Sequence, residues 1–288
     1  MKLCLKCGHK FHSVDWMCPN CGFTPSQVNG HYIFAPKSQH YSSGFKPEYF
    51  PKLFMHESTN FWFKARNKFI LWSIKSFSSL DQGLYLEVGC GTGYVLSAIS
   101  TSLSRLTIFG SEIFVAALSH AKKRASRAYL FQADARKIPF VGHFDSLGAF
   151  DVLEHITDDV LVLRQMHTAL RHNGILFLTV PQHPWLWSKS DEYSCHCRRY
   201  TASDLHNKLI SVGFDIQLST SFVSLLLPLM IFNRLSGTSK DSSPMNEFML
   251  PVWLNEILFM VMSFELLLIQ FGVRFPCGGS RLVVARKI

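Results

Sequence analysis

The chain has 288 residues, of which 48% are hydrophobic and 17% charged, and it carries a formal net charge of +9. This length and composition suit one α/β domain with additions around a large core. Residues 1–80 hold ten Lys or Arg against three Asp or Glu, whereas residues 81–221 hold thirteen of each. The basic excess favours an anionic membrane surface or a phosphate-bearing substrate, and solubility is the plainer interpretation. No run of Lys and Arg is dense enough to predict a nucleic-acid partner.

Residues 1–24 carry two paired cysteine motifs, Cys4-x-x-Cys7-Gly and Cys18-Pro-Asn-Cys21-Gly. Two thiolates separated by two residues can bind one metal from a tight turn, and the following glycine suits that turn. Four thiolates form a closed site, so we expect a structural zinc knuckle that docks on the rest of the chain or binds a protein partner. Iron and disulfides are the alternatives. No apolar signal segment follows Met1, so we expect a cytoplasmic protein, in which disulfides are disfavoured.

Residues 25–56 connect this knuckle to the rest of the chain. The segment is too aromatic for a free linker, and we expect it to pack across the domain or its pocket. The aromatic residues concerned are Tyr32, Phe34, Tyr41, Phe45, Tyr49 and Phe50.

The run Glu87-Val-Gly-Cys-Gly-Thr-Gly93 follows an apolar segment and precedes a helical pattern. Strand, glycine turn and helix form the layout that binds a nucleoside-type cofactor at a helix N-terminus. The glycines at 89, 91 and 93 allow a tight turn and a close approach of the ligand. The form E-x-G-x-G-x-G resembles motif I of the class I S-adenosylmethionine (SAM) methyltransferases, type 11 branch.

Later segments support this resemblance in the family's order, over residues 57–221 and the last nine. The resemblance implies that Glu112, at the end of the second strand, binds the ribose hydroxyls and that Asp134 and Ala135 hold the adenine. Asp151 ends the expected fourth strand, and we expect it, like Glu87, to contribute to cofactor binding. The implied fold is a doubly wound sheet of seven strands with an antiparallel last strand, at residues 280–288.

A helix is expected at Phe61-Trp-Phe-Lys-Ala-Arg66-Asn67, before the first strand of this core. It resembles a stretch found in one branch of these methyltransferases. Arg66 can pair with the SAM carboxylate, and Trp62 or Phe63 can cover the methionine moiety. The alternative is that the aromatic residues belong to the core and Arg66 to the surface.

The loop that follows the fifth strand is dense in groups that do chemistry, from Trp185 to Tyr200. Asp191 and His196 can form an acid–imidazole pair that removes a proton from the methyl acceptor, and His155 is the second candidate base. Arg198 and Arg199 can bind a phosphate or carboxylate of the substrate. We also expect Tyr200 and Trp187 to contact the substrate. The alternative is an Asp–Arg network that shapes the loop.

Residues 222–279 form an apolar insertion before the closing strand. Residues 252–271 read as one helix, with Asn255, Glu256, Ser263 and Gln270 on one narrow side and Glu265 apart from them. Glu265 near mid-span would be costly in a transmembrane helix. We therefore expect helices lying in the membrane interface or forming an apolar lid over the pocket. A buried helical pair and a dimer contact are the alternatives.

The sequence thus predicts SAM-dependent methylation of a hydrophobic or lipid-linked acceptor by a cytoplasmic protein peripheral to the inner membrane face. One alternative is a soluble methyltransferase for a small natural product, with the insertion as lid or dimer interface. The other is a SAM-sensing binding module recruited through the zinc knuckle.

Overall fold

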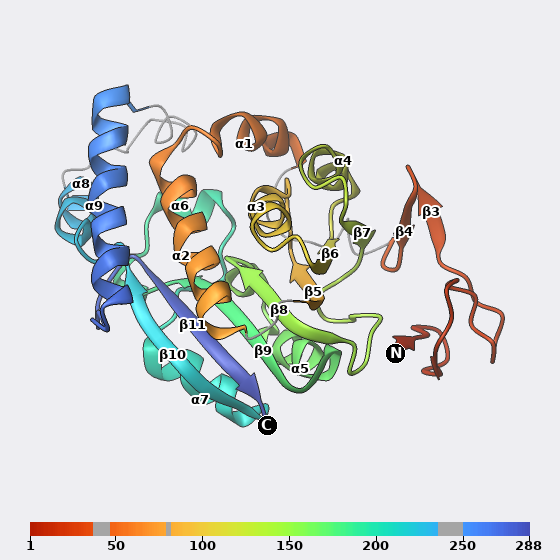
Figure 1. Cartoon of the computed structure of the whole chain (residues 1–288). Coiled ribbons are helices and arrows are strands. Elements are labelled where there is room, and N and C mark those ends of the chain that lie inside the picture. Colours follow the sequence, from red (N-terminus) through yellow and green to blue (C-terminus); the bar gives the residue numbers. More distant parts are fainter. Residues whose placement is uncertain (37–46, 79–81, 236–249) are drawn as a thin grey trace.

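The computed structural model describes residues 1–36, 47–78, 82–235 and 250–288 (Figure 1). Within these ranges a nine-stranded sheet has the order β10-β11-β9-β8-β5-β6-β7-β4-β3. Its strands are β3 (Ser26–Val28), β4 (His31–Ile33), β5 (Gly83–Val88), β6 (Leu106–Glu112), β7 (Tyr129–Gln132), β8 (Phe144–Phe150), β9 (Leu170–Pro181), β10 (Phe214–Phe222) and β11 (Ser280–Lys287).

The seven strands from β10 to β7 confirm the expected doubly wound sheet. β5 pairs in parallel with both β6 and β8, and β8 pairs in parallel with β9. β11 is antiparallel to its two neighbours, with Leu282 opposite Thr179 on β9 and Thr220 on β10. The closing strand therefore inserts between β9 and β10, although 57 residues separate it from the end of β10 in the sequence.

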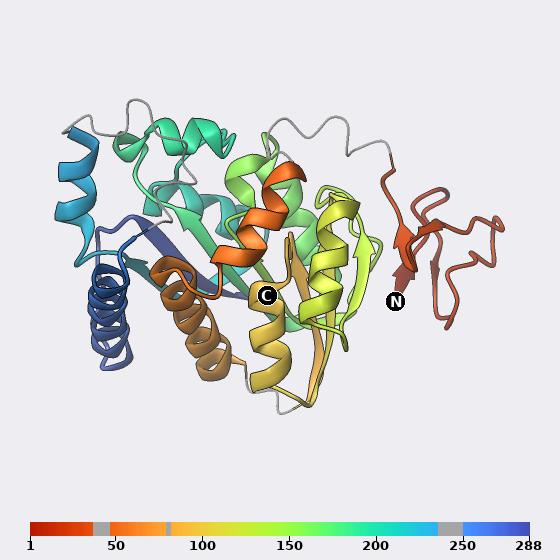
Figure 2. The same cartoon turned by 90° about the horizontal axis from the view of Figure 1, so that it is seen from above.

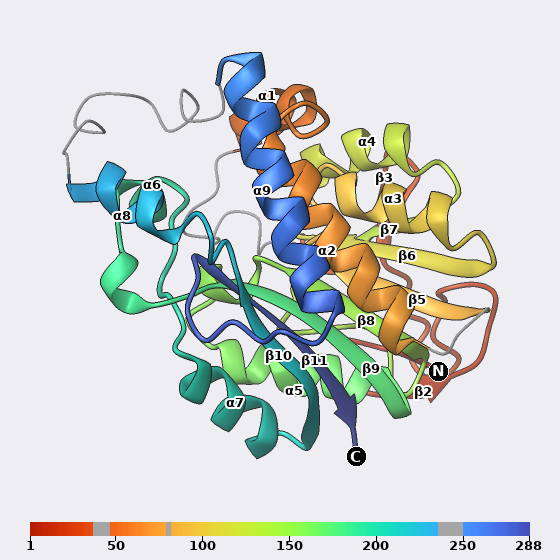
Figure 3. The ribbon, with the colours of Figure 1, turned by 60° about the vertical axis from the view of Figure 1, so that its left-hand side comes forward.

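Helices cover both faces of this sheet (Figures 1 and 3). One face carries α2 (Phe61–Phe77), α3 (Tyr94–Ser102), α4 (Val115–Arg124) and α9 (Val252–Gln270), and the other carries α5 (Asp159–Ala169) and α7 (Ala202–Ser211). The strands are apolar on both faces, as a parallel sheet between two helical layers requires. Two buried clusters result, one under α2, α3, α4 and α9 and one under α5 and α7.

The N-terminal segment adds two strands to the seven that we expected. β4 pairs in parallel with β7, and the side chain of Gln132 on β7 bonds both the N–H and the carbonyl of Ala35. Residues 25–36 are thus part of the sheet and not only a connector. β1 (Lys2–Leu3) and β2 (Lys10–Phe11) form a separate small ribbon, and Trp16 packs against Phe34 and Phe140.

Residues 47–56 of the connector pack against the domain. Helix α1 (Phe50–His56) lies against α4, where Phe50 contacts Phe114. Tyr49 stacks on Tyr193 of α6 (Lys189–Tyr193), with ring centroids 4.9 Å apart. These contacts agree with the expected packing of the aromatic residues, and Tyr41 and Phe45 lie outside the described residues.

The apolar insertion forms α8 (Leu227–Leu235) and α9, at the opposite end of the sheet from residues 1–33 (Figure 2). The narrow polar side of α9 faces α2. There Asn255 accepts a hydrogen bond from the Phe61 N–H, and Glu256 pairs with Lys64 at 3.2 Å. By length and composition α9 is a helix that can span a membrane, and 28% of its apolar window is buried in the protein.

Glu265, the acid near the middle of α9, has hydrogen-bond partners within the protein. Its side chain is buried, and its Oε2 accepts hydrogen bonds from the backbone N–H groups of Ser224 and Leu225, at 2.9 and 2.8 Å. The carboxylate thereby ties the middle of α9 to the chain that enters α8. It also holds Val223, a β-branched residue with φ of 62°, in a strained left-handed conformation.

The glycine turn gives a test of the packing between α3 and α4. Gly93 has φ of +77°, and a Cβ there would lie 2.7 Å from the Ala121 Cα, whereas a Cβ on Gly91, at φ of +50°, meets nothing within 4 Å. Gly93→Ala should destabilise the protein by roughly 3 kcal/mol through backbone strain and overpacking. Gly91→Ala should cost only about 1 kcal/mol. Urea unfolding of both variants measures the difference, and equal midpoints would contradict it.

Candidate functional site

A crevice opens at the carboxyl ends of the strands, where the strand order reverses beside β5. It contains a cavity of about 1160 Å³. The glycine turn after β5 and the segment after β8 form one wall, and residues of α8 and α9 form another. The cavity therefore joins a polar region to an apolar one.

The glycine turn carries backbone conformations that favour glycine. Gly89, Gly91 and Gly93 all have positive φ. The Gly91 N–H donates to Glu112 Oε2 at 3.0 Å, and the N–H groups of Ile113 and Phe114 donate to the other carboxylate oxygen. These three bonds fix the Glu112 carboxylate at the cavity wall, where the sequence predicts a ribose contact.

Glu87 lies beneath the turn and is 3% exposed. Burial raises its pKa to about 8, and the nearby Arg66 charge only partly opposes this effect. Its Oε2 has no hydrogen-bond partner within the described part of the chain. A buried acid of this kind gains a partner when a cationic ligand enters the cavity.

Three further predicted residues line the same cavity but have protein partners. Arg66 pairs with Asp151, with 2.6 Å between Nε and Oδ2. Asp134 pairs with its near neighbour Arg136 at 2.7 Å. A ligand that uses these groups shares them with existing ion pairs, so the predicted roles of Arg66 in carboxylate binding and of Asp134 in adenine binding remain proposals.

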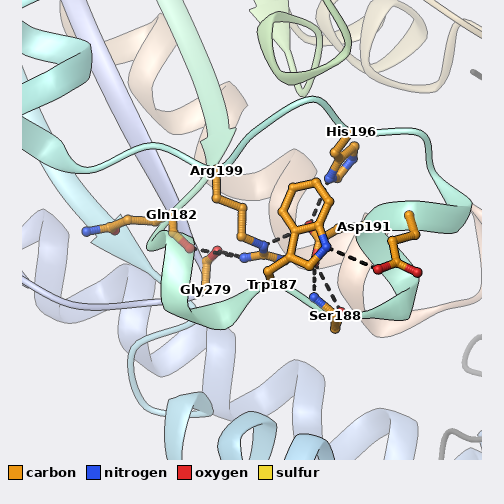
Figure 4. A network of polar contacts seen from close by, with 8 residues as sticks. Gln182, Trp187, Ser188, Asp191, His196, Arg199 and Gly279 are labelled. Carbon is orange, nitrogen blue, oxygen red and sulfur yellow. Dashed lines mark hydrogen bonds and ion pairs between the residues drawn. The ribbon is translucent and has the colours of Figure 1, made fainter. Parts of the chain in front are cut away.

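Asp191 is the centre of a polar network in the loop after β9 (Figure 4). It accepts hydrogen bonds from the Ser188 N–H at 2.9 Å, from Arg199 Nε at 2.7 Å and from His196 Nδ1 at 2.9 Å. Burial would raise its pKa, but the bond from His196 and the charge of Arg199 outweigh burial and lower the pKa to about 2. The ionised carboxylate accepts only, so His196 Nδ1 is the donor, and in the neutral imidazole Nε2 is then the acceptor.

The loop therefore contains both the expected acid–imidazole pair and the alternative, an Asp–Arg network that shapes the loop. The acid–imidazole pair exists, and Arg199 also ties the loop to the main chain by donating to the carbonyls of Gln182 and Gly279 (Figure 4). Asp191 is fully buried, so it positions His196 and is not itself at the cavity wall.

Arg198, Tyr200 and Trp187 do not line the cavity, unlike Arg199 and His196. The buried carboxylate of Asp159 binds Arg198 at 2.8 Å and the Tyr200 hydroxyl at 2.7 Å. An acid buried in a helix needs such partners, and this demand draws both side chains into a structural network. Trp187 donates a hydrogen bond to Glu192. The expected substrate contacts of Arg198, Tyr200 and Trp187 therefore stay a prediction, beside the structural contacts that these residues make.

Glu154 was not predicted, yet it adjoins both candidate bases. One ligand atom from each of Glu154, His155 and His196 lies within 4.8 Å of the others, and the two imidazole rings meet edge to face. Burial raises the pKa of Glu154 well above its usual value and lowers the pKa of His155 to about 4. The sequence places Glu154 directly before His155, but it does not reveal that both point toward the loop after β9.

The four N-terminal cysteines converge as predicted. Cys4 Sγ lies 3.7 Å from Cys21 Sγ, and Cys7 Sγ lies 3.7 Å from Cys18 Sγ. Tetrahedral zinc with Zn–S bonds of about 2.3 Å separates its sulfurs by about 3.8 Å. All four thiols are free, so the arrangement suits a metal and not disulfides.

The apolar wall of the cavity comes from the insertion, both from α8 and α9 and from the residues just before each helix. It consists of Val223, Leu226, Leu229, Met230, Leu250, Leu254 and Leu258. The insertion therefore lines the cavity as well as covering the end of the sheet.

Comparison with known proteins identifies this layout. A family model described as a methyltransferase domain matches residues 57–219. A protein of Mycobacterium tuberculosis described as a probable S-adenosylmethionine-dependent methyltransferase is 27% identical over 132 residues, which cover 45% of this chain and 47% of the relative. The malonyl-[acyl-carrier protein] O-methyltransferase of Legionella pneumophila is 26% identical over 132 residues, covering 42% of this chain and 45% of the relative. The chain spans about half the length of the curated relatives it matches.

Solved structures share the fold at low sequence identity. Phosphoethanolamine N-methyltransferase 2 of Haemonchus contortus, in complex with SAM, has a TM-score of 0.52 and 17% identity over 77% of this chain and 52% of its own. The [4+2]-cyclase SpnF has a TM-score of 0.58 and 17% identity over 88% of this chain and 98% of its own. Because one of these is a cyclase, the fold alone does not fix the reaction. The family model, which matches more than half of the chain, shows that this chain belongs to the methyltransferase-domain family.

Proposed function

We propose that this protein transfers the methyl group of SAM to a hydrophobic or lipid-linked acceptor at the cytoplasmic face of the membrane. The observation that carries the proposal is the two-sided cavity, polar at the glycine turn and apolar at α8 and α9. Pockets for single ligands usually enclose roughly 300–1,000 Å³. The cavity of about 1160 Å³ therefore has room for a cofactor and for part of an acceptor.

The cofactor belongs at the polar wall. Gly89, Gly91 and Gly93 bring the backbone close to it, Glu112 is oriented for the ribose, and Ala135 lines the cavity beside Asp134. SAM carries a sulfonium and an ammonium, and the buried acid Glu87 lies in the same wall. Opposite charges in a buried site attract strongly enough to select the ionised acid.

Methyl transfer from a sulfonium is an in-line displacement, in which the S–CH₃ bond breaks and its electron pair stays on sulfur. The protein aligns the acceptor, excludes water and takes a proton from an acceptor that carries one. We assign the proton acceptance to His196 Nε2, because Asp191 fixes the opposite nitrogen as donor and His196 lines the cavity. His155 lies beside it, with ring centroids 4.8 Å apart.

The outer face of α9 supports membrane contact. Six exposed apolar residues follow one another at spacings of four and three, which places them on one helical face. These are Trp253, Ile257, Met260, Phe264, Leu267 and Phe271. Lys64 and Lys68 of the adjacent α2 flank the helix, both against the Phe259 ring. An apolar face with basic neighbours suits an anionic lipid surface.

The four cysteines supply a structural zinc site in this proposal. Their geometry fits the ion, and the ribbon they hold packs on Phe34 and Phe140 through Trp16. Because the ribbon has a small core of its own, the metal supplies most of its folding energy. In this proposal the exposed side of the ribbon is the surface on which a protein partner would dock.

Cofactor binding should release a proton near neutral pH. Glu87 has a raised pKa of about 8, and a cationic ligand lowers it, so affinity for SAM should rise with pH by up to about tenfold per unit and level off above 8. Calorimetry in buffers of different ionisation enthalpy measures the released protons. Glu87→Gln should release fewer protons, and the contribution of the cofactor's own amino group cancels in the comparison. Equal release by both proteins would contradict the assignment.

The acceptor can be identified with methyl-labelled SAM, a lysate of the source cells and an organic–aqueous partition. Label should enter the organic phase with the unaltered protein and fall by roughly 100-fold or more with His196→Ala. SAM binding should persist in this variant. His206→Ala, a part-buried histidine on α7 that bonds Ser219, is the matched control and should keep activity. Label in the aqueous phase would favour a soluble substrate, and cofactor binding without transfer would favour a sensor.

Membrane contact can be tested by flotation with vesicles of phosphatidylcholine and phosphatidylglycerol. Phe264→Asp should weaken binding on the order of 30-fold, because about 2 kcal/mol of apolar burial is lost. Ile210→Asp on α7 alters a residue that is 61% exposed on the other face of the sheet, and it should float like the unaltered protein. If the unaltered protein does not float but has the mass of a dimer, and Phe264→Asp abolishes that dimer, the apolar face contacts a second copy of the chain and not the membrane.

A further inference from the structure

We propose that Glu154, His155 and His196 bind a divalent first-row transition-metal ion in the wall of the cavity, at a site separate from the four cysteines. Two imidazole nitrogens and one carboxylate oxygen form a ligand set that zinc and its neighbours use in catalytic sites. The three side chains come from two segments, the turn after β8 and the loop after β9, which the strand order brings together.

The distances suit an ion after a small closure of the side chains. The three ligand atoms lie within 4.8 Å of one another. Tetrahedral coordination at about 2.1 Å separates ligand atoms by about 3.4 Å. The separations must therefore shorten by at most about 1.4 Å, which is within the reach of side-chain rotations.

Glu154 needs a partner that the described residues do not supply. Its side chain is 0% exposed, and neither carboxylate oxygen has a hydrogen-bond partner within the described ranges. The nearest guanidinium groups are engaged elsewhere, since Arg66 pairs with Asp151 and Arg199 pairs with Asp191. A buried acid without a donor is strongly destabilised. A bound cation beside His155 and His196 removes that cost.

The surroundings of His196 match those of a metal-ligating histidine. Such residues donate the nitrogen that faces away from the metal to a carboxylate, which fixes the tautomer and the ring orientation. Here His196 Nδ1 bonds Asp191, and the Ser188 N–H and Arg199 hold Asp191 in turn. His155 Nδ1 is also buried and has no hydrogen-bond partner within the described residues.

The site has an open side. All three residues line the cavity that also contains the glycine turn and the apolar wall. Three protein ligands leave a position for an outside oxygen, as in catalytic and not structural zinc sites. The substrate class that this geometry selects is an acceptor with a hydroxyl group, which rests on the proposed methyl transfer.

The chemistry follows from that position. The ion lowers the pKa of the bound hydroxyl, whose proton passes to solvent. The resulting oxygen attacks the methyl carbon, an O–CH₃ bond forms, and the S–CH₃ electron pair remains on sulfur as the thioether product. With the ion bound, His196 is a metal ligand, and the ion activates the acceptor hydroxyl in place of the imidazole. In the metal-free protein the imidazole itself takes the proton.

Metal analysis of the full chain tests the site without cofactor or acceptor. The unaltered protein, loaded with Zn²⁺ and dialysed, should retain one ion on the cysteines and one more. Glu154→Gln and His196→Ala should each lose that second ion, and His206→Gln should keep both. Loading with Co²⁺ separates the sites, because only the cysteines give thiolate-to-metal charge-transfer bands. Cys7→Ser should lose those charge-transfer bands and keep the cavity ion, which has no thiolate ligand.

Two outcomes would overturn the proposal: a single ion in the unaltered protein, bound by thiolates, or a second ion that both cavity variants retain. Because two variants of different chemistry are used, misfolding of one leaves the other informative. Methyl transfer is measured separately, so a missing second ion leaves the proposed transfer standing with His196 as the base. If methyl transfer is not observed, the number of bound ions still tests the metal site by itself.

Discussion

A parallel sheet whose strand order reverses must leave a crevice where the connections part, and this constraint organises the whole molecule. β5 has β6 on one side and β8 on the other, so the chain leaves them for opposite faces of the sheet. The glycine turn and the segment from Asp151 to His155 lie at the two sides of that opening. Every group to which we assign chemistry, and the apolar wall as well, is placed relative to this one gap. The insertion adds residues of α8 and α9 as one wall of this gap.

Buried carboxylates fasten the parts that the sheet does not hold. Asp191 anchors the loop after β9, Asp159 anchors its continuation through Arg198 and Tyr200, and Glu265 anchors α9 to the start of α8. Each acid is costly to bury alone but gains several directed bonds. Polar networks therefore hold the loops around the cavity, and one of them orients His196. Orientation is what a site for chemistry needs most.

The sequence predicted those features in which one residue type meets a local geometric requirement. The three glycines have the positive φ that the motif predicted, the four cysteines converge, and the closing strand takes its antiparallel place. It was uninformative where a role depends on distant neighbours. Tyr200 was expected at the substrate and lies in the core because Asp159 needs a donor, and Glu154 gave no signal because its neighbours come from another loop. The pairing of β4 with β7 involves only two residue pairs, too short for any periodicity.

That short pairing has a consequence for how the protein is handled. β7 would be an edge strand without β4, and unpaired strand edges recruit other chains. The cover depends on residues 1–36 staying in place, with Trp16 packed on Phe140 and β3 as a brief, exposed outer strand. With zinc on the four cysteines as proposed, oxidation of those thiolates releases the ion and loosens the cover. Oxidative damage to four small side chains is then converted into aggregation of the whole protein, so solubility depends on reducing conditions.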